Sequence, residues 1–154
     1  TTLFVTHDQE EALDLADRVV ILDQGRIVQE GTPEEVCRRP SSAFVMTFLG
    51  DTNRLEGTVS NGVAQVAGAA VEAAGVADGP VEILARPGDL GWAASGQGIP
   101  ARVARVIDRP EGRRILARTD AGQTVELDVP PETAIAADER GVILIRHGKV
   151  FAAS

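Results

Sequence analysis

Residues 2–22, TLFVTHDQEEALDLADRVVIL, combine a strand signal and a helix signal in one short stretch. Thr2–Val5 is a run of strand-forming residues, which predicts a buried strand. Thr6, followed three residues later by Gln9, has the spacing of a capping box, so Thr6 is expected to cap a helix. The residues at helical spacing on its predicted buried face are Ala12, Leu15, Ala16 and Val19. The stretch therefore predicts a strand, a polar turn and an amphipathic helix.

A hairpin and two short helices are expected to follow. Val19–Leu22 is too uniformly apolar for an amphipathic helix and predicts a strand, and a turn at 23–26 leads to a second strand at Ile27–Gln29. Thr32 and Ser42 each precede a helical pattern and are expected to be N-caps. Further start and stop signals are Pro33, Glu35, Pro40 and Gly50. Residues 1–50 thus predict an α/β unit.

The remaining residues, 51–154, have a different sequence pattern, in which short apolar runs are separated by Gly, Asn and Asp. The expected strands are Leu55–Val59, Val63–Val66, Val81–Ala85, Ala101–Ile107, Arg113–Arg118, Thr124–Leu127, Val142–Arg146 and Val150–Ala152. Short strands at this density predict an all-β barrel or sandwich, with the oligonucleotide-binding fold as one candidate. In Val142–Ile145 every residue is apolar, so the side chains on both faces of the predicted strand are apolar. This strand is therefore expected to be buried on both faces.

Composition narrows the class of protein. The chain has 154 residues and a formal net charge of −8, from 15 basic and 23 acidic side chains, which argues against a nucleic-acid or anionic-lipid partner. One Cys excludes an internal disulfide and a four-Cys zinc site. No apolar run reaches the length of a membrane span. These features predict a cytoplasmic protein, and Thr1, which opens directly on a strand, predicts a piece of a longer chain.

His7 is the residue best suited to chemistry in residues 1–50. It follows a predicted strand and precedes a predicted helix, and open α/β sheets place their ligands at such turns. There an imidazole can hydrogen-bond a phosphate oxygen or orient a water molecule. The alternative is that His7 only satisfies the backbone of its turn. A metal site shared with His147 is not expected, because no Cys or carboxylate adjoins either histidine at ligand spacing.

Five segments of residues 1–50 resemble the C-terminal end of the ATPase domain of ABC importers that serve sulfate, iron, polyamines and sugars. They are Val5–Ala12, Leu15–Val19, Asp23–Ile27, Gln29–Pro33 and Pro40–Val45. The junction Asn53–Gly57 is most similar to that of sulfate/thiosulfate importers. By this resemblance, His7 is the catalytic switch-loop histidine, which contacts the γ-phosphate of ATP and helps to position the attacking water. Residues 51–154 then correspond to the family's TOBE-type regulatory domain, an oligonucleotide-binding-like barrel.

The resemblance also implies cofactors, partners and a location. The full-length subunit is expected to hydrolyse ATP with Mg²⁺, to form a homodimer, and to lie on the inner face of the cell membrane through permease subunits, with no nucleic acid bound. The chain itself has no G-x-x-x-x-G-K-[ST] phosphate loop, since its one Gly-Lys pair, at 148–149, lacks both the upstream Gly and the hydroxyl residue. The chain alone is therefore expected to be inactive.

Two other functions fit a small β-barrel. A stand-alone oxyanion sensor could bind its anion through backbone amides at turns, but Lys149 is the only lysine and the predicted turns hold no cluster of Ser and Thr. Nucleic-acid binding would use aromatic stacking, for which this barrel has one Trp and a net negative charge. A structural role is expected for Arg86, which could reach the carboxylate of Asp89 or Glu82.

Overall fold

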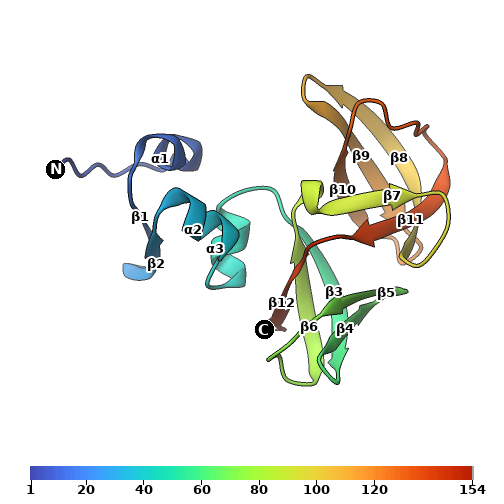
Figure 1. The fold of residues 1–154 in the computed structure, drawn as a ribbon, viewed down its shortest axis with the longest axis horizontal. Helices are drawn as coiled ribbons and strands as arrows, with labels where there is room; N and C mark the ends of the chain where they lie inside the picture. The colour runs from blue at the N-terminus through green and yellow to red at the C-terminus, as the bar shows by residue number, and fades with distance from the viewer. Residues whose placement is uncertain (154) are drawn as a thin grey trace. The chain divides into compact units, whose positions relative to one another are not determined.

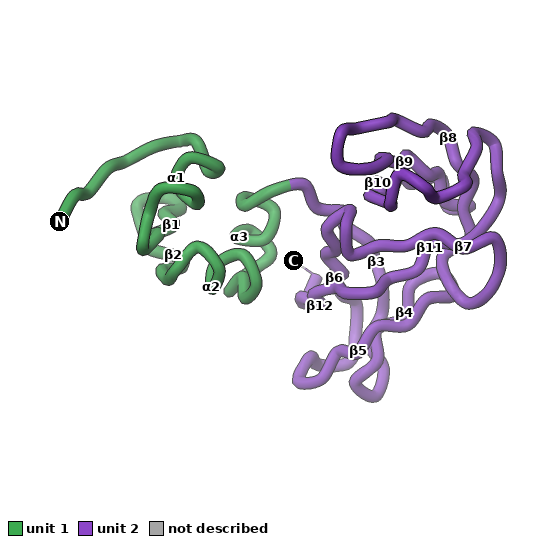
Figure 2. The backbone as a smooth tube through the Cα atoms, turned by 45° about the horizontal axis from the view of Figure 1, so that its top comes forward, with its two compact units in different colours: residues 1–50 green, residues 51–154 purple. Residues whose placement is uncertain are grey.

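The computed structural model describes residues 1–153, which form two compact units (Figure 2). Unit 1 comprises residues 1–50 and unit 2 begins at residue 51. No helix within residues 1–153 is long and apolar enough to cross a membrane.

Unit 1 contains three short helices and one hairpin (Figure 1). In chain order they are α1 (Gln9–Leu15), β1 (Val19–Asp23), β2 (Arg26–Gly31), α2 (Pro33–Arg38) and α3 (Ala43–Phe48). The two strands pair antiparallel, and Gln24 and Gly25 between them both have positive φ, the geometry of a tight hairpin turn. A small core forms from Ile21, Val36, Val45 and Leu49. The hairpin and the two following helices are therefore as predicted.

The predicted N-caps of α2 and α3 are confirmed. The Thr32 hydroxyl accepts a hydrogen bond from the Glu35 N–H at 3.3 Å, and the Glu35 carboxylate accepts one from the Thr32 N–H at 2.9 Å. The hydrogen bond from the Thr32 backbone N–H to the Glu35 carboxylate, with a smaller contribution from the Thr32 side chain, lowers the pKa of the Glu35 carboxyl. The Ser42 hydroxyl accepts from the Val45 N–H at 3.2 Å. Each cap satisfies a backbone donor that the first helical turn leaves free.

The predicted strand at Thr2–Val5 is wrong. The segment has no regular secondary structure, and the side chains of Leu3 and Val5 are 90% and 87% exposed. A strand needs a neighbour to satisfy its backbone donors and acceptors, and none pairs with this segment within the described residues. Strand-forming composition alone does not supply that neighbour.

The predicted start of α1 is also wrong, because Asp8 and not Thr6 is the N-cap. The Asp8 carboxylate accepts a hydrogen bond from the Glu11 N–H at 3.0 Å, while the Thr6 hydroxyl accepts one from the Asp8 N–H. Asp is among the strongest N-caps, and its side chain outcompetes Thr6 here. The predicted buried stripe is not formed either: α1 has no buried residue, and Leu15 is 70% exposed.

Unit 2 is an all-β structure of ten strands and one 3₁₀ turn, η1 (Pro87–Asp89). Its strands are β3 (Asn53–Ser60), β4 (Val63–Val66), β5 (Ala69–Glu72), β6 (Gly79–Ala85), β7 (Leu90–Ala93), β8 (Ile99–Arg109), β9 (Gly112–Thr119), β10 (Thr124–Val129), β11 (Arg140–Ile145) and β12 (Lys149–Ala152). All eight predicted strands are present, and β5 and β7 are additional.

The ten strands form two five-stranded antiparallel sheets (Figure 1). The β3 sheet has the order β12-β6-β3-β4-β5, and the β9 sheet has the order β10-β9-β8-β11-β7. Buried apolar side chains from both sheets form one core, which includes Leu55, Ile83, Leu90, Ile99, Val103, Ile115, Leu127 and Ile143. On β11 only Ile143 is fully buried, and its neighbours Val142, Leu144 and Ile145 are half-buried, so the strand is less enclosed than expected.

Gly141 allows β11 and β7 to pack closely. A Cβ at this position would collide with the carbonyl oxygen of Ala93 and would lie 2.6 Å from the ring of Trp92. Because one contact is with backbone, no rotamer change could relieve it. Gly88, in contrast, has nothing within 4 Å of the same position.

The Gly141→Ala variant is expected to lose about 1–3 kcal/mol of unfolding free energy, because the added methyl overpacks the β7–β11 contact. Trp92 is the only Trp, so its fluorescence during urea unfolding reports on unit 2. Gly88→Ala is the matched control and should change stability by no more than about 0.5 kcal/mol. Equal effects of the two substitutions would contradict the close packing at Gly141.

Candidate functional site

His7 lies in the loop between Thr6 and the start of α1. Its side chain is exposed, and it makes no hydrogen bond or ion pair with any residue in the described part of the chain. The hydrogen bonds that close its turn come instead from the flanking Thr6 and Asp8 side chains. The alternative in which His7 merely satisfies the turn backbone is therefore not what the geometry shows. Both ring nitrogens are available to a ligand.

The surroundings of His7 do not form a phosphate site by themselves. The nearest charged residues along the chain are acidic: Asp8, Glu10 and Glu11. These carboxylates disfavour a bound phosphate unless cations or backbone donors from elsewhere outweigh them. Within residues 1–153 no cluster of three or more His, Cys, Asp or Glu side chains could hold a metal ion. The His7 side chain can therefore supply one hydrogen bond or orient one water, and no metal-binding cluster accompanies it within residues 1–153.

The Gly148-Lys149 pair and Arg86, which the sequence also singled out, do not form a ligand site. The Gly148-Lys149 pair leads into strand β12 and not into a helix, so it lacks the geometry of a phosphate loop. Arg86 precedes η1, and the two carboxylates that it was expected to reach have other partners: Glu82 lies 3.0 Å from Arg54, and Asp89 lies 3.8 Å from the His147 imidazole. No ion pair joins Arg86 to either carboxylate within residues 1–153, so of the two possibilities for this side chain the ion pair is not the one found.

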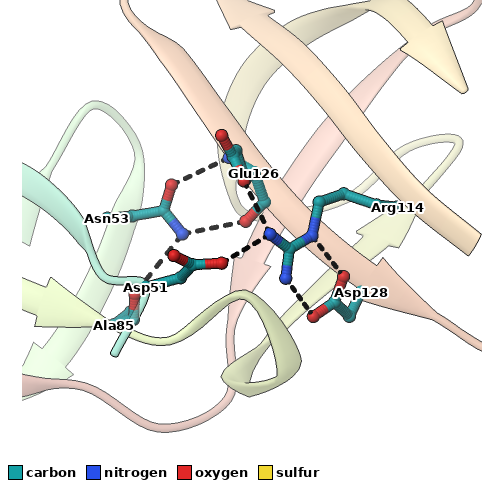
Figure 3. Close-up of polar contacts among 6 residues, drawn as sticks. All are labelled: Asp51, Asn53, Ala85, Arg114, Glu126 and Asp128. Carbon is teal, nitrogen blue, oxygen red and sulfur yellow. Dashed lines mark hydrogen bonds and ion pairs between the residues drawn. The ribbon is translucent and has the colours of Figure 1, made fainter. Parts of the chain in front are cut away.

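The most organised polar site lies in unit 2 around Arg114 of β9 (Figure 3). Arg114 and Asp128 are directly paired across β9 and β10, and their side chains form a bidentate ion pair with N–O distances of 2.7 and 2.8 Å. Nη1 of Arg114 also donates to Asp51 at 2.7 Å and to Glu126 at 2.9 Å. Arg114 is only 7% exposed. Its burial is tolerated because three carboxylates surround it.

The electrostatics of this cluster follow from its geometry. The hydrogen bonds from Arg114 lower the pKa of the Asp128 carboxyl, which burial alone would raise. The hydrogen bonds to Asp128 and Asp51 raise the pKa of Arg114 in turn. Arg114 and Asp128 thus stabilise each other's charged form.

Asn53, the first residue of β3, links the two sheets beside this cluster (Figure 3). Its side-chain amide donates to the carbonyl of Glu126 in the β9 sheet at 2.8 Å and to that of Ala85 in the β3 sheet at 3.3 Å. Its side-chain carbonyl accepts from the Glu126 N–H at 2.8 Å. A second bond of this kind runs from the Gln123 side chain to the carbonyl of Arg54. The arrangement is structural, since its polar groups satisfy one another.

Sequence analysis did not find the Arg114 cluster. The available signals were the alternation of Arg114 with apolar residues on β9 and the matching spacing of Glu126 and Asp128 on β10. These signals become a prediction only when the register of the two strands is known.

The Asn53→Ala variant is expected to lose about 2–3 kcal/mol of unfolding free energy, because it leaves buried backbone groups of Glu126 and Ala85 without partners. Urea unfolding followed by Trp92 fluorescence measures the loss. Gln97→Ala, at an exposed loop position, is the control and should have little effect. A loss for Asn53→Ala no larger than for this control would show that the sheets do not need the amide bridge.

The Asp128→Asn variant is expected to be less stable than the parent by about 1–2 kcal/mol at pH 7, a modest loss because the Asp128 side chain is 42% exposed. The folded-state pKa of Asp128 is lowered, so its stabilisation is present above the unfolded-state pKa, near 4, and is lost as pH falls through the folded-state value. The difference between the two proteins in urea unfolding should therefore shrink as the pH falls below about 4. A difference independent of pH would contradict the ion pair as its cause.

Comparison with known proteins shows which proteins the chain is similar to. No protein-family model matches the chain. Sulfate/thiosulfate import ATP-binding protein CysA 2 of Agrobacterium fabrum is 57% identical over 152 residues, which are 98% of this chain and 45% of that protein. CysA of Xanthomonas campestris is 45% identical over 157 residues (99% and 45%), and CysA 1 of Rhizobium meliloti is 42% identical over 149 residues (94% and 43%). The chain thus spans less than half the length of these relatives. The similarity to sulfate/thiosulfate import ATP-binding proteins thus extends over nearly the whole of this chain.

Proposed function

We propose that the chain acts as the C-terminal part of an ATP-hydrolysing importer subunit that couples ATP hydrolysis to the uptake of sulfate or thiosulfate. In this proposal unit 1 ends the ATPase domain and unit 2 is a TOBE-type regulatory barrel with an oligonucleotide-binding-like fold. The complete subunit forms a homodimer and docks on membrane permease subunits from the cytoplasmic side. The names of the relatives support the transported anion.

The observation that carries the proposal is the exposed apolar surface of unit 1. Nine of the ten large hydrophobic side chains that are exposed lie in unit 1, and only Val63 lies in unit 2. Three of them, Val20, Leu22 and Ile27, belong to the β1–β2 hairpin. Soluble proteins seldom expose so much apolar surface without a partner for it. In the longer relatives, the residues that this chain does not cover could supply the partner.

The curled antiparallel sheets of unit 2 support the assignment as a regulatory barrel. Unit 2 buries its own apolar residues in one core, and its sheets are joined by the Asn53 bridge. It therefore has the properties of an independent domain appended to the ATPase domain. Small antiparallel barrels commonly serve as binding modules.

The role proposed for His7 is to contact the γ-phosphate of ATP and to position the attacking water. Its exposed, unpartnered imidazole supports this role. The residues described around it do not fit Mg²⁺-ATP by themselves, because they provide neither a phosphate cradle nor a carboxylate set for the metal. We therefore expect the chain alone to be inactive, with hydrolysis confined to a subunit that contains the rest of the ATPase domain.

The His7→Ala variant of the complete subunit is expected to lose about 10²–10⁴-fold in ATP turnover, the usual contribution of a general-base or water-positioning group. Nucleotide binding should persist, because the phosphate loop supplies most of the affinity. His147→Ala is the matched control, since His147 is the other histidine of these 154 residues and its side chain is 83% exposed. Near-normal turnover of His7→Ala would refute the role of His7, and loss of nucleotide binding would show that it acts before the chemical step.

A further inference from the structure

Three arginines lie side by side across the β9 sheet. Arg102 of β8 is directly paired with Arg118 of β9 on one side and with Arg140 of β11 on the other. Directly paired residues of antiparallel strands lie on the same face, with Cβ atoms about 5 Å apart. All three arginines are exposed, whereas Ala101 and Ala117, which neighbour them along the strands, are buried. The arginine row therefore lies on the outer face of the sheet.

The charge of the arginine row is only partly compensated. Arg140 donates to the Asp120 carboxylate at 2.9 Å, and Arg102 donates to the backbone carbonyl of Asp138 at 3.0 Å. The side chain of Arg118 has no hydrogen bond or ion pair with any residue from 1 to 153. Its Nη2 lies over the turn that contains Gly122, where an added Cβ would be 3.9 Å away. One carboxylate thus hydrogen-bonds a row of three cations.

This surplus of positive charge is unusual for its surroundings. Like charges paired directly across strands destabilise a sheet, and the chain as a whole has a net charge of −8. Arg114 and Arg118 lie four residues apart on β9. Arg114 is paired with Asp128 of β10, whereas Arg118 is paired with the uncharged Thr124 of the same strand. The unmatched arginines should therefore attract an anion from solution.

We propose that the arginine row, Arg140–Arg102–Arg118, binds a divalent tetrahedral oxyanion of the size and charge of sulfate. Guanidinium groups bind oxyanions through two parallel N–H donors. Neighbouring strands are about 4.8 Å apart, so one small anion can contact two guanidinium groups at once. The hydroxyl of Thr124, opposite Arg118, can donate a further hydrogen bond. The choice of sulfate among such anions rests on the proposed function, whereas the site itself rests on the register of the strands.

The test is a titration of the 154-residue chain with sodium sulfate against sodium chloride at matched ionic strength, followed by NMR shifts of the arginine side chains and of the backbone amides around Thr124. Sulfate should give saturable shifts at the arginine row that chloride does not give. Arg118→Ala and Arg102→Ala should each weaken sulfate binding about tenfold or more, since each removes charge-assisted hydrogen bonds. Arg118→Lys, which keeps the charge but loses the paired donors, should bind with intermediate affinity.

Arg109→Ala is the matched control. Arg109 is exposed at the end of β8 far from Arg102, and its replacement removes the same single positive charge. Non-saturating shifts, equal shifts with chloride, or an equal loss of affinity in Arg109→Ala would overturn the proposal. Saturation by a short thymidine oligonucleotide without a response to sulfate would also overturn it, in favour of a nucleic-acid surface. No ATP and no permease enter the titration, so its result is independent of whether His7 acts in ATP hydrolysis.

Discussion

The side-chain amide of Asn53 holds together two sheets that share no strand. A carboxamide presents the same donor and acceptor as a peptide unit, so Asn53 bonds to the backbone of Ala85 on one sheet and of Glu126 on the other as a neighbouring strand would. The Arg114 cluster reinforces this junction, because one guanidinium holds Asp51, which precedes β3, together with the carboxylates of β10. The single core of unit 2 depends on this alignment, since its apolar side chains come from both sheets.

Local patterns predicted the strands of unit 2 well, because apolar residues that alternate with polar ones, and the turn residues between strands, can be recognised in the sequence. The strands that sequence analysis missed, β5 and β7, are short edge strands made largely of Ala, Gly and Leu, with little alternation to detect. The opposite error occurred at Thr2–Val5, where a strong strand composition has no neighbour to pair with. Propensity describes what a segment can form, whereas pairing depends on residues that are distant in the sequence.

The candidate site was only partly accessible from the sequence for the same reason. His7 was identified from its place in a motif, and its exposure and lack of partners were not predictable from that motif. The Arg114 cluster was missed altogether, because its members range from Asp51 to Asp128 and meet only when β3, β9 and β10 are in register. The arginine row likewise follows from the pairing of β8, β9 and β11, not from any local run of basic residues.

The two units differ in the kind of side chain that they expose without a partner: arginines in unit 2 and large apolar residues in unit 1. This difference decides which unit can bind a ligand by itself. Unit 2 encloses its apolar residues and leaves charge outside, so the arginine row is held on a completed sheet and can bind a ligand without help. Unit 1 leaves apolar side chains exposed, and the His7 imidazole has no hydrogen bond or ion pair within residues 1–153 to hold it in place. A catalytic group needs its position held to within about 0.5 Å by packed neighbours. Catalysis by His7 therefore requires surfaces beyond unit 1, and the exposed hairpin residues Val20, Leu22 and Ile27 are where such a surface would attach.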